Sequence, residues 1–91
     1  MMEMIHSDFV KSQKGVLFEI NQAIEVGDIK KANLLTHTMR SYAALMNEHL
    51  LESISAAVEE SLRKAEIPEK SQMDKLEVEI KKVFASLKED Y

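Results

Sequence analysis

Apolar residues recur along most of the chain in steps of three and four, the spacing that places them on one face of a helix. The clearest stripe consists of Met73, Leu76, Ile80, Val83 and Leu87. Two further stripes comprise Leu51, Ile54, Val58, Leu62 and Ala65, and Ala32, Leu35, Met39, Ala43 and Met46. A looser one near the N-terminus contains Phe9, Val16, Leu17, Ile20, Ala23 and Ile24. The pattern therefore predicts four amphipathic helices.

Turn-forming residues divide the first three predicted helices. Gly27 suits the left-handed position that follows a helix, and Asp28 suits the N-cap of the next one. Asn47 tolerates the same left-handed conformation and predicts a second stop. Pro68 disfavours helix in the residue before it, so the third helix should end near residue 66.

Ser71, with Asp74 three positions later, is a candidate N-cap for the last helix. The four helices are thus expected at 3–26, 28–46, 48–66 and 70–89. Gly15 marks a point where the first helix can bend or break, because glycine costs about 1 kcal/mol relative to alanine inside a helix.

Composition supports one small helical domain over residues 1–91. The chain is 45% apolar and 31% charged, with only two Gly and one Pro, and a chain of this length carries a single core. Short connections make consecutive helices antiparallel. The expected fold is an all-α, antiparallel up-and-down four-helix bundle.

Charge and residue usage exclude several classes of function. The net charge is −4, and no segment gathers the Lys and Arg needed to bind nucleic acid phosphates. The absence of cysteine excludes disulfides and thiolate metal sites. No apolar run approaches the ~20 residues of a membrane-spanning helix. We expect a cytoplasmic protein without membrane insertion.

His37, in the second predicted helix, is a candidate functional residue. It lies two positions from inward-facing Met39, about 200° around the helix, so the imidazole should face solvent. Its face should also carry Lys30, Asn33, Arg40, Ser41 and Ala44, which are polar or small. A neutral imidazole is a nitrogen nucleophile and a guanidinium can stabilise negative charge beside it, yet an exposed helical histidine is commonly just a surface residue.

The sequence T-H-T-M-R-S-Y-A, preceded by A-I-E-V-G-D, resembles the signature of histidine phosphotransfer (HPt) domains, helical carriers in multistep two-component relays. His37 matches the phospho-acceptor and Arg40 the basic residue three positions later. Further matches are Ala23-Ile24, Gly27-Asp28, the small residues Ala43 and Ala44, Met46, Leu51 and the pair Val58-Glu59.

The resemblance implies that His37 accepts a phosphoryl group from the aspartate of one receiver domain and passes it to another. It gives Arg40 the role of stabilising charge, and it places Asn33, Ser41 and Ala44 where the partner approaches. The partners would be receiver domains of response regulators or of a hybrid sensor kinase, and the carrier would be a monomer. The receiver supplies Mg²⁺, so the chain would need no cofactor. No glycine-rich nucleotide loop is present, so independent kinase activity is not expected.

Four positions depart from the family pattern. Arg40 replaces the usual lysine, which keeps the charge but changes its geometry. Ser41 replaces a glycine and Tyr42 a small hydroxyl residue, so the surface beside His37 should be bulkier than usual. Asn47 replaces the glycine of the turn between helices, a change that its backbone tolerance permits.

Other interpretations remain open at the level of sequence. A non-catalytic helical adaptor, chaperone or assembly factor, which can be a dimer, needs only the apolar stripes and makes His37 an ordinary surface residue. His49 follows the turn at Asn47 and is a poor second candidate for the acceptor. His6 has the Glu-x-x-His spacing of carboxylate-bridged metal bundles, but such sites need two copies, so no metal site is predicted.

Overall fold

The computed structural model describes residues 2–89, which form five α-helices. They are α1 (Met2–Gln13), α2 (Val16–Glu25), α3 (Ile29–Leu45), α4 (His49–Arg63) and α5 (Lys70–Glu89). The chain is all-helical as predicted, but the predicted count of four helices is too low. The segment expected as one helix over 3–26 is interrupted at Gly15, which takes a left-handed φ of 79°.

Three helices end in the same way, with a left-handed residue followed by a backbone hydrogen bond back into the last turn. The left-handed residues are Gly27 (φ 83°), Asn47 (φ 59°) and Ala65 (φ 60°). In each case the next amide donates to a carbonyl five residues earlier, at 2.8 to 2.9 Å, as in a Schellman motif. The predicted stops at Gly27 and Asn47 are confirmed. Asp28 caps α3 as predicted, because its side chain accepts a hydrogen bond from the Lys31 amide.

One predicted helix end and one predicted cap are wrong. The third predicted helix corresponds to α4, which ends at Arg63 rather than near residue 66. It ends there because Ala65 adopts a left-handed φ and the Glu66 amide donates back to the Ser61 carbonyl. Ala65 is consequently exposed rather than part of the inner stripe. Ser71 is not the cap of the last helix, since α5 begins one residue earlier and the Glu69 carbonyl accepts from the amides of residues 72 and 73.

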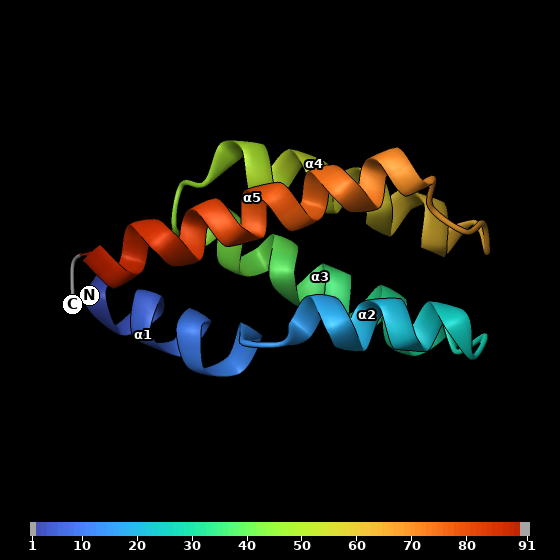
Figure 1. Cartoon of the computed structure of the whole chain (residues 1–91), viewed down its shortest axis with the longest axis horizontal. Coiled ribbons are helices and arrows are strands. Elements are labelled where there is room, and N and C mark those ends of the chain that lie inside the picture. Colours follow the sequence, from blue (N-terminus) through green and yellow to red (C-terminus); the bar gives the residue numbers. More distant parts are fainter. Residues whose placement is uncertain (1, 90–91) are drawn as a thin grey trace.

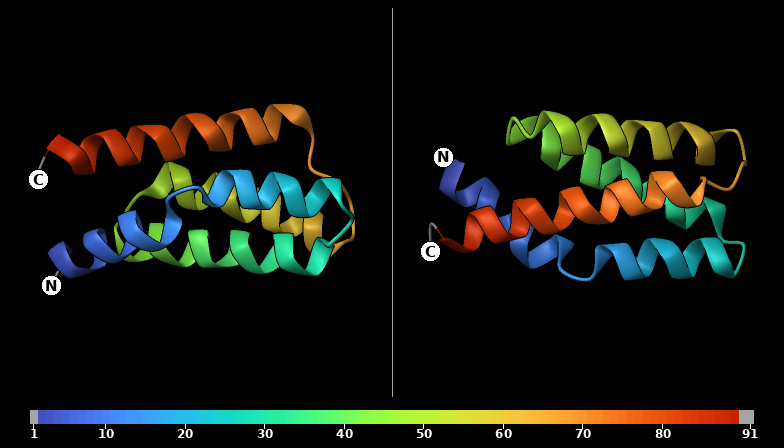
Figure 2. Two further views of the ribbon diagram at one scale, coloured as in Figure 1. Left: turned by 60° about the horizontal axis from the view of Figure 1, so that its bottom comes forward. Right: turned by 45° about the horizontal axis from the view of Figure 1, so that its top comes forward.

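The central helix of the arrangement is α3, which packs against α2 on one side and α4 on the other, while α5 packs on α4. The N-terminal helix α1 contacts α2, α3 and α5. Figures 1 and 2 show that α1 begins and α5 ends at the same end of an elongated molecule, whose principal extents are 37 × 19 × 18 Å. Over residues 2–89, no helix is both long and apolar enough to cross a membrane.

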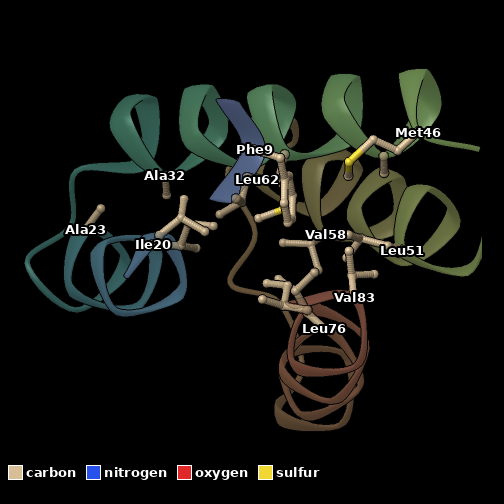
Figure 3. Close-up of a cluster of buried hydrophobic side chains, with 14 of the residues drawn as sticks. Phe9, Ile20, Ala23, Ala32, Met46, Leu51, Val58, Leu62, Leu76 and Val83 are labelled. Carbon is tan, nitrogen blue, oxygen red and sulfur yellow. The ribbon is translucent and has the colours of Figure 1, made fainter. Parts of the chain in front are cut away.

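One buried cluster joins all five helices, as Figure 3 shows with side chains from Phe9 to Val83. Phe9 fixes α1 to it, since its ring lies 5.8 Å from that of Tyr42 in an edge-on contact and 5.0 Å from that of Phe84. Most of the predicted inward positions are buried: Phe9, Val16, Ile20, Ala23, Ala32, Met39, Ala43, Met46, Leu51, Val58, Leu62, Leu76, Ile80, Val83 and Leu87. Five others are partly buried against them: Leu17, Ile24, Leu35, Ile54 and Met73.

Candidate functional site

The pairing of α3 with α4 brings His37 and Arg40 onto one carboxylate, that of Glu59. His37 Nδ1 lies 2.6 Å from Glu59 Oε2, and Arg40 Nη1 donates to Glu59 Oε1 at 2.7 Å. The residues are 22 and 19 positions apart in sequence. Each carboxylate oxygen of Glu59 thus has its own partner on the neighbouring helix.

Core packing sets the direction of these side chains. On α3, Met39 and Ala43 are buried, which turns His37 outward as predicted: its side chain is 58% exposed. On α4, Val58 and Leu62 are buried, and Glu59 follows Val58 at the edge of the helix that faces α3. The Glu59 side chain is only 15% exposed. The site therefore combines an open imidazole with a largely covered carboxylate.

The environment keeps Glu59 ionised. Burial by itself would raise the pKa of this carboxyl, but the hydrogen bonds from Arg40 and His37 and their charges outweigh burial, so its pKa lies below the ordinary value. Reciprocally, the hydrogen bond and charge of Glu59 raise the pKa of Arg40. At neutral pH the pair consists of a carboxylate and a guanidinium.

An ionised Glu59 also decides which nitrogen of His37 carries the proton. A carboxylate can only accept hydrogen bonds, so Nδ1 must be the donor across the 2.6 Å contact. In a neutral imidazole the other nitrogen, Nε2, then holds the lone pair. The geometry therefore produces a nucleophilic nitrogen on an exposed ring.

The other predicted site residues lie around His37. Asn33 lines a shallow pocket of about 240 Å³ together with Lys30, Leu34, His37 and Glu59. Ser41 is exposed and donates its hydroxyl proton to the His37 carbonyl at 3.0 Å. Ala44 is exposed further along the same helix.

Tyr42, the bulky departure from the family pattern, does not crowd the imidazole. It lies on the side of α3 that faces α1, where its ring contacts Phe9 and its hydroxyl accepts a hydrogen bond from Ser12 at 3.2 Å. Tyr42 therefore does not limit close approach to His37.

Glu59 was not among the predicted site residues, although the resemblance matched the pair Val58-Glu59. The available signal was its position directly after an inward-facing valine, at the edge of a helix stripe. This position predicts that Glu59 lies near a neighbouring helix. It does not predict which residues of that helix Glu59 contacts.

The two remaining histidines lie outside this arrangement. His49 is highly exposed, with Nδ1 3.9 Å from Glu52 Oε1 on the same helix. His6 lies on α1. In the part of the chain that the structure describes, no three His, Asp or Glu side chains gather as metal ligands would.

Comparisons with family models, curated proteins and solved structures found no match for this chain.

Proposed function

We propose that this chain is a histidine phosphotransfer carrier, which accepts a phosphoryl group from a receiver-domain aspartate on Nε2 of His37 and passes it to a second receiver. The observation that carries the proposal is the contact between His37 and Glu59. It leaves Nε2 as the nucleophile of a ring whose side chain is 58% exposed. In this proposal α1 and α2, which are separated by the break at Gly15, together take the place of the first helix of the four-helix bundle expected of the class.

The transfer would run as an in-line displacement. The Nε2 lone pair of His37 attacks phosphorus, the bond from phosphorus to the aspartyl oxygen breaks, and the aspartate leaves as a carboxylate. Positive charge develops on the imidazole during the attack, and the Glu59 carboxylate beside Nδ1 stabilises it. Transfer of this kind depends mainly on positioning and charge. The onward step to the second receiver is the reverse.

Arg40 would offset the charge of the phosphoryl group. Its guanidinium lies one helical turn from His37 and is anchored by Glu59, which limits the conformations it can adopt. The planar guanidinium offers several N–H donors, so it can keep one bond to Glu59 and use others for phosphoryl oxygens. Mg²⁺ and the remaining catalytic groups would belong to the receiver, as the resemblance implies.

The test uses two donors of different size. Phosphoramidate can phosphorylate histidine directly, whereas a receiver domain charged with acetyl phosphate must dock first. We expect the chain to acquire acid-labile, alkali-stable phosphate from both, and His37→Gln to acquire none from the receiver domain. His49→Gln is the matched control and should be labelled like the wild type. Equal labelling of His37→Gln and the wild type would refute the role of His37.

A further inference from the structure

His37 and Arg40 both reach Glu59, but they open onto different pockets. The imidazole lines the shallow pocket of about 240 Å³ together with Lys30, Asn33, Leu34 and Glu59. The guanidinium lines a separate pocket of about 250 Å³ together with Ala56, Glu59, Glu60 and Arg63. Glu59 is common to both pockets, and the cation that shares the pocket of His37 is Lys30.

Lys30, Asn33 and His37 form a row along one face of α3. They follow one another in steps of three and four residues, which places them one above the other on the helix. Lys30 lies about 20° from His37 around the helix axis, whereas its neighbour Lys31 lies about 120° away. Side chains of a helix lean towards its N-terminus, so the imidazole extends over the turn that carries Asn33 and towards Lys30.

A phosphoryl group on His37 would bring a second anion into this pocket. Nδ1 lies 2.6 Å from the Glu59 carboxylate, so a group on Nε2 avoids that hydrogen bond but stays close to the negative charge. Among the residues that line the pocket, Lys30 is the cation and Asn33 is the neutral side chain with N–H donors. The ion pairs among the described side chains do not involve Lys30, so its ammonium can turn to phosphoryl oxygens.

We propose that Lys30 and Asn33 hold the phosphoryl group of phosphorylated His37, with the Lys30 ammonium and the Asn33 side-chain amide donating hydrogen bonds to its oxygens. Lys30 and His37 are about 10.5 Å apart along the helix axis. The flexible four-carbon stem of lysine, the imidazole and the phosphoryl group together span that distance. This assignment, which rests on the proposed function, places a second cation at the site, in a different pocket from Arg40.

The contact should lengthen the lifetime of the phosphoryl group on His37. In hydrolysis, water attacks phosphorus, the bond from phosphorus to Nε2 breaks, its electron pair returns to the ring and inorganic phosphate leaves. The transition state is loose and resembles metaphosphate, so the phosphoryl oxygens carry less negative charge there than in phosphohistidine. A cation beside these oxygens therefore stabilises the phosphorylated protein more than the transition state.

The experiment compares two neighbouring lysines in the whole chain, charged by phosphoramidate. His6→Gln and His49→Gln form the background of every sample, so that the label resides on His37. Lys30→Gln and its matched control Lys31→Gln each remove one exposed positive charge. At low salt we expect phosphohistidine to hydrolyse about three- to fivefold faster in Lys30→Gln, the range that an exposed ion pair supplies, and at the background rate in Lys31→Gln. The difference should shrink as added salt screens the contact.

NMR spectra of the same samples report the contact of Asn33 directly. Phosphorylation of His37 should move the side-chain N–H resonances of Asn33 and leave those of Asn21, at an exposed position of α2, in place. Equal hydrolysis rates in Lys30→Gln and Lys31→Gln, or unmoved Asn33 resonances, would overturn this assignment while leaving His37 as the acceptor. Absence of label on His37 from both phosphoramidate and a charged receiver would instead overturn the proposed function.

Discussion

His37 Nδ1 and Glu59 Oε2 lie 2.6 Å apart across the α3–α4 contact, and this pair determines what the site can do. A histidine on an exposed helix face ordinarily samples both neutral tautomers, with the proton on either nitrogen. Here a carboxylate that remains ionised selects the tautomer with the proton on Nδ1. The same carboxylate holds Arg40 at 2.7 Å, so one side chain of α4 positions both the imidazole and the guanidinium of α3.

Replacing Glu59 should therefore affect His37 without removing it. In Glu59→Gln the amide can donate or accept, so it no longer selects one tautomer. We expect the ring to populate both tautomers in ¹⁵N NMR spectra and phosphoryl acceptance by His37 to slow about tenfold, the lower end of the loss seen when the carboxylate that orients a metal-binding histidine is removed. Glu60→Gln, one residue along the same helix, is the control and should keep the wild-type tautomer. A single Nδ1–H tautomer in Glu59→Gln would contradict this role.

The titration of Glu59 should depend on Arg40. Burial alone would raise the pKa of the carboxyl, whereas the bonds and charges of Arg40 and His37 bring it below the ordinary value. The Glu59 side-chain carboxyl carbon, followed by NMR, should thus titrate at lower pH than an ordinary glutamate carboxyl. In Arg40→Gln its midpoint should move upward. An unchanged midpoint would show that Arg40 does not hold this carboxylate.

The lowered pKa of Glu59 makes the stability of the fold depend on pH. A carboxyl whose pKa is lower in the folded state contributes stability that is fully present above its ordinary pKa and is lost as pH falls through the lower folded value. The free energy of unfolding of the wild type should therefore fall more steeply than that of Arg40→Gln in the acid range below the ordinary carboxyl pKa. Urea denaturation at a series of pH values measures this difference, and parallel curves would contradict it.

Phe9 should contribute most of the attachment of α1. Its side chain is fully buried between Tyr42 and Phe84, and truncating a buried phenylalanine costs about 3–5 kcal/mol. Phe9→Ala should lower the free energy of unfolding by that amount or release α1, which hydrogen exchange would reveal. Phe18→Ala, at an exposed position of α2, should change stability by no more than about 0.5 kcal/mol.

Ala65 occupies a backbone conformation that alanine adopts at a cost. With φ at 60° it bears a penalty of roughly 1–2 kcal/mol that glycine avoids, although glycine also favours the unfolded chain. Ala65→Gly should raise the free energy of unfolding by about 0.5–1 kcal/mol. Ala57→Gly, at an exposed position inside α4, should lower it by about 1 kcal/mol. Loss of stability in both variants would show that the left-handed turn at Ala65 is not maintained in solution.

The predicted elements succeeded where a local rule decides the structure. Gly27 and Asn47 stop helices because few residues tolerate a left-handed φ, and Asp28 caps α3 because its carboxylate reaches an amide three residues away. Ala65 stops α4 in the same conformation, but alanine gives no such signal, so the sequence placed that end too late. Thr36 and Ser55 are also buried, but as polar residues they are not part of the apolar stripes from which the core was predicted.

By itself, the sequence determined the helical class, most of the helix limits and the outward direction of His37. These follow from interactions within a few residues, namely backbone preference, capping and the periodicity of side chains around one helix. Only the tertiary structure decided that Glu59 meets both His37 and Arg40, and that Tyr42 packs against α1 rather than beside the imidazole. Such contacts depend on how far one helix slides and rotates against another, which the packing of the whole core fixes.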